Sequence, residues 1–130
     1  MRQPTVFVVS ADASVGDSVR VLAESVYLQS RTFLSLKGFF TELEPGHEGC
    51  LVINAEARER YDREQQELFG AAVASMPCLL LTDRGDVNMA VYGLKAGASD
   101  IVQKPYRDHN LLNSIKQMIG ITATDSSMSV

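Results

Sequence analysis

The sequence predicts an α/β domain in which a parallel β-sheet is covered by helices on both faces. Short apolar runs alternate five times with segments whose apolar residues recur at helical spacing. Uniformly apolar runs are typical of strands buried on both faces, and their alternation with helices is typical of parallel sheets. The length of 130 residues suits one domain, and the hydrophobic fraction of 45% is that of a globular protein.

The first half of the chain predicts two strand–helix units and the strand of a third. A β-branched and aromatic run predicts a buried strand over residues 5–9, and residues 29–33 predict a polar edge strand. A strand over residues 50–53 follows. The first helix begins after an N-cap at Asp12 or Ser14, and the second ends in the Glu-Pro-Gly of residues 44–46. Their apolar positions are Val15, Val19, Leu22 and Val26, then Leu36, Phe39, Phe40 and Leu43.

The second half continues this alternation. We predict helices over residues 63–75 and from Asp86 to just before Gly97, with strands over residues 78–81 and 100–103. A last helix carries the apolar stripe of Leu111, Leu112, Ile115, Met118 and Ile119.

The C-terminal segment differs in composition from the rest. Residues 121–130 are polar and rich in Ser and Thr, so we expect a flexible tail after a domain of residues 1–120. Five βα units with right-handed crossovers predict a doubly wound, flavodoxin-like fold with strand order 2-1-3-4-5.

Charge and cysteine content limit the partners and the compartment. The net charge of -4 without a basic stripe argues against direct nucleic-acid binding, and no apolar run is long enough to cross a membrane. The apolar run in residues 1–10 is too short for the core of a signal peptide, so we expect none. Cys50 and Cys78 each begin an apolar run, which predicts buried reduced thiols in a cytoplasmic protein.

Polar side chains follow four of the predicted strands at the edge where such folds bind ligands. The carboxyl ends of parallel strands meet at one edge of the sheet, near the switch between the first and third strands. We therefore expect one pocket to contain Ser10, Ala11, Asp12, Asn54, Glu56, Thr82, Asp83 and Lys104.

Two segments near the C-terminus resemble the FixJ-like branch of response-regulator receiver domains. They are LTDRGDVNMAV at residues 81–91 and KAGASDIVQKPY at residues 95–106, and the resemblance extends over about residues 5–120. It implies the phosphoacceptor module of two-component signalling, which is not an enzyme in its own right.

The resemblance also assigns a role to each pocket position. The family's acidic Mg²⁺-binding pair falls on Ser10 and Ala11, and its phosphoacceptor Asp falls on Asn54. Thr82 matches the hydroxyl that binds the phosphoryl group, and Lys104 matches the lysine that precedes a cis-proline. Ile101 stands where the family has an aromatic switch residue.

The three missing carboxylates predict a degenerate acceptor site. Without them Lys104 leaves a local charge of about +1, which does not attract Mg²⁺, so we expect no metal and no cofactor. Asp12 is a helix cap in this interpretation, rather than a substitute metal ligand. Glu56 or Asp83 is expected to pair with Lys104, and the Asn54 carbonyl oxygen can also accept its hydrogen bond.

We therefore predict a pseudo-receiver that acts through protein–protein contact without phosphorylation. The first alternative is a sensor that binds a small anion or other ligand at Asn54, Thr82 and Lys104 without metal. The second is the receiver part of a longer transcription regulator. Hydrolysis by the haloacid-dehalogenase route ranks last, because its nucleophilic Asp would be Ser10.

The fourth helix supplies the candidate interface. Its core stripe is expected to be Val87, Ala90, Val91 and Leu94, which leaves Met89 and Tyr92 outside it. The family pairs or binds partners through its fourth helix, fifth strand and fifth helix. The resemblance thus implies a partner protein or a homodimer that contacts Met89, Tyr92, Lys95 and Tyr106.

A charged segment precedes the third helix. Residues 55–67 contain i,i+4 acid–base pairs such as Glu59/Arg63 and Arg63/Glu67, and they lack the Pro and Gly usual in the family. Two interpretations stay open: an early start of the third helix, or a mobile loop. A solvated charged face is favoured over a dedicated partner site.

Overall fold

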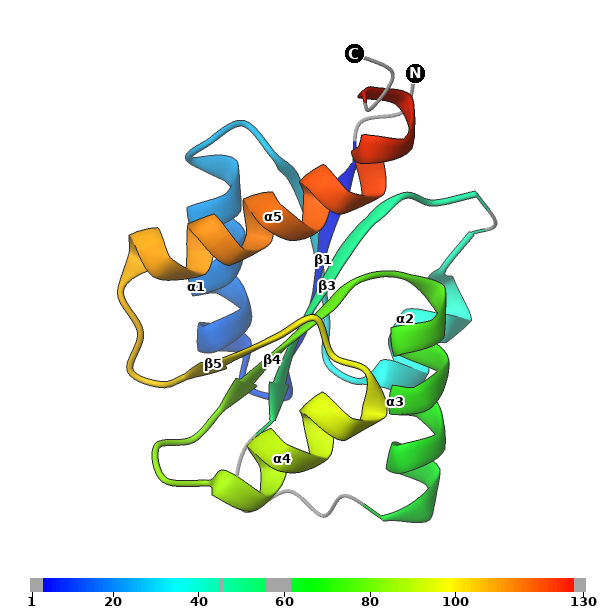
Figure 1. Ribbon diagram of the computed structural model, residues 1–130, viewed down its shortest axis with the longest axis vertical. Helices are drawn as coiled ribbons and strands as arrows, with labels where there is room; N and C mark the ends of the chain where they lie inside the picture. Colours follow the sequence, from blue (N-terminus) through cyan, green and yellow to red (C-terminus); the bar gives the residue numbers. More distant parts are fainter. Residues whose placement is uncertain (1–3, 45, 56–61, 128–130) are drawn as a thin grey trace.

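The computed structural model shows one five-stranded parallel sheet with helices on both faces (Figure 1). It describes residues 4–44, 46–55 and 62–127, with only the backbone of residues 121–127. The strand order is β2-β1-β3-β4-β5, as predicted. The strands are β1 (Thr5–Val9), β2 (Gln29–Phe33), β3 (Gly49–Ala55), β4 (Cys78–Thr82) and β5 (Asp100–Gln103). The helices are α1 (Ala13–Glu24), α2 (Leu36–Glu42), α3 (Arg63–Ser75), α4 (Val87–Ala96) and α5 (Asp108–Ser127).

The register of the strands brings their carboxyl ends together. Val9 pairs with Ile53 across β1 and β3, Ala55 pairs with Thr82 across β3 and β4, and Thr82 pairs with Gln103 across β4 and β5. Residues that directly follow or end these strands therefore lie at one edge of the sheet. This is the edge where the sequence predicts the site.

The sheet separates two hydrophobic cores, because successive side chains of a strand point to opposite faces. On one face, Phe7 and Leu80 pack with residues of α2, α3 and α4. On the other, Val8 and Leu79 pack with residues of α1 and α5. All four side chains are fully buried, and each contributes on the order of 1.5–3 kcal/mol of burial free energy. Both faces of β1, β3 and β4 are thus covered, as their apolar runs predict.

Polar caps start the helices where the sequence predicts them. The Asp12 side chain accepts a hydrogen bond from the Ser14 N–H at 2.9 Å, so Asp12 is the N-cap of α1. Asp62 caps α3 by accepting from the Gln65 N–H at 2.9 Å. The helix thus begins at residue 63, as predicted. The expected structure of the loop before it falls on residues 56–61, outside the described part of the chain.

The predicted core face of α4 is wrong. Val87, Val91 and Leu94 are 62%, 43% and 57% exposed, whereas Met89 and Tyr92 pack against the core. The reason lies at Gly93, which is buried against the sheet and has no side chain to hold the helix away. The side of α4 that carries Gly93 therefore packs against the sheet, and the stripe of Val87, Val91 and Leu94 faces outward.

The C-terminal helix is longer than expected. The backbone of α5 is helical through Ser127, whereas the sequence predicts a flexible tail from residue 121. The Ser/Thr-rich composition of this segment is a weak indicator, because helix propensities differ by only tenths of a kcal/mol among such residues. Within the described residues, no helix has the length and apolarity needed to cross a membrane.

Candidate functional site

Three buried polar side chains lie at the edge of the sheet where the sequence predicts the site. Ser10 follows β1, Asn54 lies near the end of β3, and Thr82 ends β4. They are 3%, 4% and 0% exposed, respectively. Such buried polar groups need hydrogen-bond partners, and the partners of Ser10 and Asn54 define the site.

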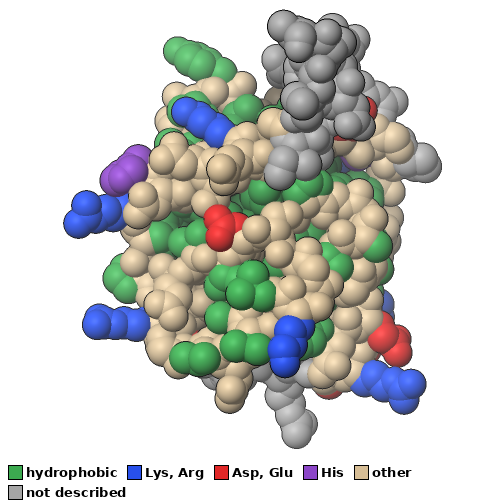
Figure 2. All heavy atoms as spheres, viewed as in Figure 1, with side chains coloured by type: hydrophobic (Ala, Val, Ile, Leu, Met, Phe, Trp, Pro, Cys, Tyr) green, Lys and Arg blue, Asp and Glu red, His purple; other side chains and the backbone are tan. Residues whose placement is uncertain are grey.

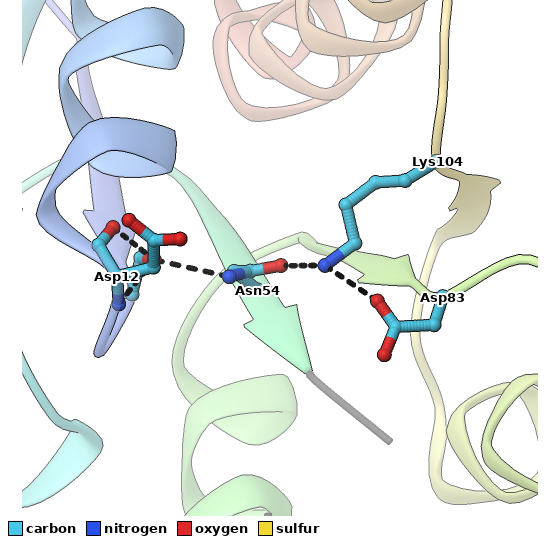
Figure 3. Close-up of polar contacts among 5 residues, drawn as sticks. Asp12, Asn54, Asp83 and Lys104 are labelled. Carbon is cyan, nitrogen blue, oxygen red and sulfur yellow. Dashed lines mark hydrogen bonds and ion pairs between the residues drawn. The ribbon is translucent and has the colours of Figure 1, made fainter. Parts of the chain in front are cut away.

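A continuous hydrogen-bond chain joins Lys104, Asn54 and Ser10 (Figure 3). The Lys104 ammonium donates to Asn54 Oδ1 at 2.5 Å, and Asn54 Nδ2 donates to Ser10 Oγ at 3.1 Å. An ammonium group can only donate, so it requires the carbonyl side of the Asn54 amide, and the NH₂ group then faces Ser10. The Ser10 hydroxyl donates in turn to the backbone oxygen of Asp12 at 2.7 Å. The chain ties the carboxyl ends of β1 and β3 to the segment after β5.

Asp83 neutralises the charge of Lys104. Its Oδ1 lies 3.0 Å from the Lys104 Nζ, and the lysine side chain is only 20% exposed. Of the two expected acidic partners, Asp83 is the one observed, whereas Glu56 lies outside the described residues. The local charge expected from Lys104 alone is thereby reduced from about +1 to about zero.

Asp12 caps the first helix. Its Oδ1 accepts from both the backbone N–H and the hydroxyl of Ser14, at 2.9 and 2.7 Å. These two hydrogen bonds favour the ionised form and lower the pKa of Asp12 below its usual 3.8. Ala11 is exposed and brings no carboxylate. Nowhere in the described ranges do three or more His, Cys, Asp or Glu side chains converge as metal ligands do.

Thr82 has a buried hydroxyl group without a hydrogen-bond partner. Its Oγ1 and the Oγ of Ser30 are the two fully buried side-chain nitrogen or oxygen atoms, among those the structure describes, that make no hydrogen bond. The Thr82 backbone oxygen does accept from the Lys104 N–H, at 2.8 Å. The peptide bond between Lys104 and Pro105 is cis, as the resemblance implies.

Ile101 lies under α4 rather than beside the pocket network. It is partly buried and packs against the core. A Cβ added at Gly93 would lie 2.9 Å from Ile101 Cδ1, so the helix and the strand are in close contact here. The family's switch position thus holds an aliphatic side chain below the helix.

Of the four residues of the candidate interface, two are turned toward the core. Lys95 is exposed and Tyr106 is partly buried, and burial and the nearby Asp108 raise the tyrosine's pKa. Met89 and Tyr92 face inward, and the Tyr92 ring lies 5.7 Å from that of Phe69. Figure 2 shows hydrophobic side chains gathered on the face that carries α4 and β5. The exposed residues that sequence reasoning missed are Val87, Val91 and Leu94, and their i,i+4,i+7 spacing indicated a stripe but not its direction.

Comparison with known proteins identifies relatives of one kind. No protein-family model matches the chain. This chain is 33% identical over 117 residues to the transcriptional regulatory protein TdiR of Thauera aromatica. The aligned region covers 90% of this chain and 52% of TdiR. Over 118 residues it is 29% identical to the transcriptional regulatory protein FixJ of Azorhizobium caulinodans, covering 91% of this chain and 56% of FixJ. The chain thus spans about half the length of the curated relatives it matches.

Solved structures agree with these relatives. The response regulator StyR superposes with a TM-score of 0.80 at 32% identity, over 98% of this chain and 65% of StyR. The structure of FixJ-N superposes with a TM-score of 0.78 at 25% identity, over 92% of this chain and 95% of the FixJ-N chain. Together with the strand order, the Thr82 and Lys104 positions and the cis-proline, these similarities establish the family. The chain is a receiver domain of the response-regulator family of two-component signalling, in its FixJ-like branch.

Proposed function

We propose that this receiver domain signals without phosphorylation of an aspartate. The observation that carries the proposal is the hydrogen-bond chain from Lys104 through Asn54 to Ser10. An amide replaces the nucleophilic carboxylate, and a hydroxyl and a methyl group replace the metal-binding pair. The lysine that would neutralise a phosphoryl group is already paired with Asp83 and bonded to Asn54.

The energetics of phosphoryl transfer support this conclusion. The reaction depends mainly on positioning and on metal and cationic stabilisation of the transferred group. Mg²⁺ is bound in proteins through one or two carboxylates, and Ser10, Ala11 and Asn54 supply none. Asp12 is held by Ser14 at the start of α1, so it is not available as a replacement.

Titration with Mg²⁺ and beryllofluoride, a mimic of the phosphoryl group, tests the proposal at the site itself. We expect the backbone amide resonances of Ser10, Asn54 and Lys104 to stay in place when both are added. Saturable shifts that centre on these three amides would contradict the proposal. Asp12→Asn is the control for weak cation binding at the start of α1, since it removes the nearest carboxylate.

The output we propose is protein–protein contact through the outward face of α4. Val87, Val91 and Leu94 are half of the six exposed large hydrophobic residues in the described chain, and they lie on one helix. Exposed apolar side chains grouped in this way mark interaction sites more often than scattered ones do. Lys95 and Tyr106 are placed at the border of this contact, which joins a second copy or a partner protein in the cytoplasm.

A substitution on this stripe can test the role of the stripe in binding without changing the stability of the fold. Val91→Glu is expected to weaken self-association or partner binding, and the midpoint of thermal unfolding should stay nearly unchanged because the residue is exposed. Leu34→Glu, at a residue that is 69% exposed and lies before α2, is the matched control. Light scattering and partner pull-down give the readout. Equal behaviour of the two variants would rule out the α4 face.

An anion sensor is the second candidate function. The unpartnered hydroxyl of Thr82 favours it, since a buried donor of this kind gains by binding an acceptor. The ion pair between Asp83 and Lys104 weakens it, because an arriving anion must compete with a carboxylate already in place. Titration with inorganic phosphate, with Thr82→Val as the control, decides whether the pocket takes an anion.

The whole protein can also be a transcription regulator of which this chain is the receiver part. This proposal depends on the names of TdiR and FixJ and on the half-length match to them. The test is the native coding sequence beyond residue 130. A DNA-binding segment fused to this domain would support the proposal, and a stop codon directly after Val130 would contradict it.

A further inference from the structure

A groove between α1 and the start of α5 is separate from the acceptor pocket. Its volume is about 670 Å³, within the range of roughly 300–1,000 Å³ typical of small-ligand sites. One wall is a continuous face of α1 that includes Asp17, Val21 and Leu22, and the other contains Tyr106 and Asp108. The groove therefore joins the first helix to the segment that follows Lys104.

The groove combines an apolar surface with negative charge. Val21, Leu22 and Tyr106 supply apolar and aromatic surface, and Asp17 and Asp108 supply two carboxylates. Among the described residues that line it there is no lysine or arginine. Arg107 is exposed and stands between the lining residues Tyr106 and Asp108 in the chain. The guanidinium of Arg20 contacts the lining residue Asp17. It lies 3.7 Å from Asp17 but closer to Glu24, at 3.0 Å.

Tyr106 gives the groove a further preference. Its ring packs against the core formed with α1 and α5, so its position is held from below. Aromatic faces attract organic cations, and the attraction grows where water is partly excluded. The carboxylate of Asp108, two residues along the chain, adds to the negative potential around the ring.

We propose that this groove binds a small organic cation with an aromatic or aliphatic body. The ammonium group would lie near Asp17 and Asp108, and the body would pack on Val21, Leu22 and Tyr106. An organic anion of the same shape is repelled by the two carboxylates. The site stands whether or not Asn54 takes part in signalling, because none of the lining residues belongs to the Lys104–Asn54–Ser10 chain.

The test uses three probes that share a phenyl ring and differ in charge: 2-phenylethylammonium, 2-phenylethanol and phenylacetate. We expect 2-phenylethylammonium to give saturable shifts in the amide spectrum of the full chain, centred on Asp17, Val21 and Asp108. The alcohol should bind more weakly and phenylacetate not at all. Absence of saturable shifts with the cation, or equal shifts with all three probes, would overturn the proposal.

Variants of the lining residues locate the site and test its charge. Asp17→Asn and Asp108→Asn should each weaken binding of the cation about two- to fivefold, as expected for exposed ion pairs. Val21→Lys should abolish binding, because it places a cation in the groove. Glu48→Gln removes an exposed carboxylate outside the groove and should leave the affinity unchanged. If Glu48→Gln weakened cation binding as much as the groove variants do, the effect would come from the net charge of the protein. That result would contradict a defined site.

Discussion

Lys104 donates a hydrogen bond to the side-chain carbonyl oxygen of Asn54 at 2.5 Å, across 50 residues of sequence. The bond joins the segment after β5 to the end of β3. It places the amide where the family has its phosphoacceptor and turns the NH₂ group of Asn54 toward Ser10. A polar cluster of an ammonium, an amide and a hydroxyl group thus stands where the resemblance places the family's acceptor site.

Removal of the lysine should destabilise the fold through Asn54. Lys104→Met leaves the buried Asn54 Oδ1 without its donor, and such a loss costs about 1–3 kcal/mol. We expect the free energy of unfolding, measured by urea titration, to fall by that amount. The matched control is Lys95→Met on the exposed side of α4, which should change stability by less than about 0.5 kcal/mol. Equal effects of the two substitutions would show that the Asn54 bond contributes nothing.

Replacement of glycine by alanine should destabilise the protein at Gly93 and stabilise it at Gly70. At Gly93 an added Cβ would lie 2.6 Å from Leu80 Cδ2 and 2.9 Å from Ile101 Cδ1, so the core must shift. At Gly70 on α3 the Cβ would meet nothing within 4 Å, and alanine should stabilise the helix by about 0.5–1 kcal/mol.

Replacing glycine by alanine raises helix propensity equally in both helices. The difference in stability between Gly93→Ala and Gly70→Ala therefore measures the cost of the steric clash at Gly93. We expect Gly93→Ala to be less stable than Gly70→Ala by about 1–3 kcal/mol, the usual cost of overpacking. Thermal and urea unfolding of both variants give the comparison. Equal stabilities would mean that α4 moves away from the sheet without cost.

The two cysteines should be unreactive in the folded protein. Burial raises the pKa of both Cys50 and Cys78 from 9.0 to about 12, and the two lie in the separate cores on opposite faces of the sheet. Since the thiolate is the reactive form, a thiol reagent at about pH 8 should label the native chain only as fast as it opens. Rapid stoichiometric labelling would contradict this burial.

The same pKa shifts set the sign of one pH effect. The thiols ionise near pH 9 in the unfolded chain and near pH 12 in the folded one. The unfolded state therefore loses protons first, and the stability that these thiols contribute below pH 9 is lost as the pH rises toward 12. A Cys50→Ala, Cys78→Ala chain should show a shallower loss over this interval.

Strand positions and the gathering of polar residues at one sheet edge were predictable, the first from local apolar runs and the second from the topology of parallel sheets. The apolar runs of β1, β3 and β4 predict strands buried on both faces, and the rule that strand ends meet places Ser10, Asn54 and Lys104 at one edge of the sheet. The side-chain bonds between them also follow from chemistry, since a buried lysine requires acceptors. The choice of Asp83 as its acid partner required the structure.

The orientation of α4 was not predictable from its pattern. The helix has apolar residues on more than one face, and a ten-residue segment gives few turns from which to judge the buried one. Close packing at Gly93 decides the outcome, and glycine carries no hydrophobic signal. The extension of α5 to Ser127 was missed for a different reason, because polar composition alone does not exclude a helix.

Phosphoryl uptake from acetyl phosphate in the presence of Mg²⁺, followed by intact mass, tests the central claim most directly. The natural chain is compared with a Ser10→Asp, Ala11→Asp, Asn54→Asp variant, which restores the three carboxylates that the family uses. We predict that the natural chain keeps its mass, and that the triple variant gains one phosphoryl group only when Mg²⁺ is present. Stoichiometric gain of a phosphoryl group by the natural chain would contradict a receiver that works without phosphorylation.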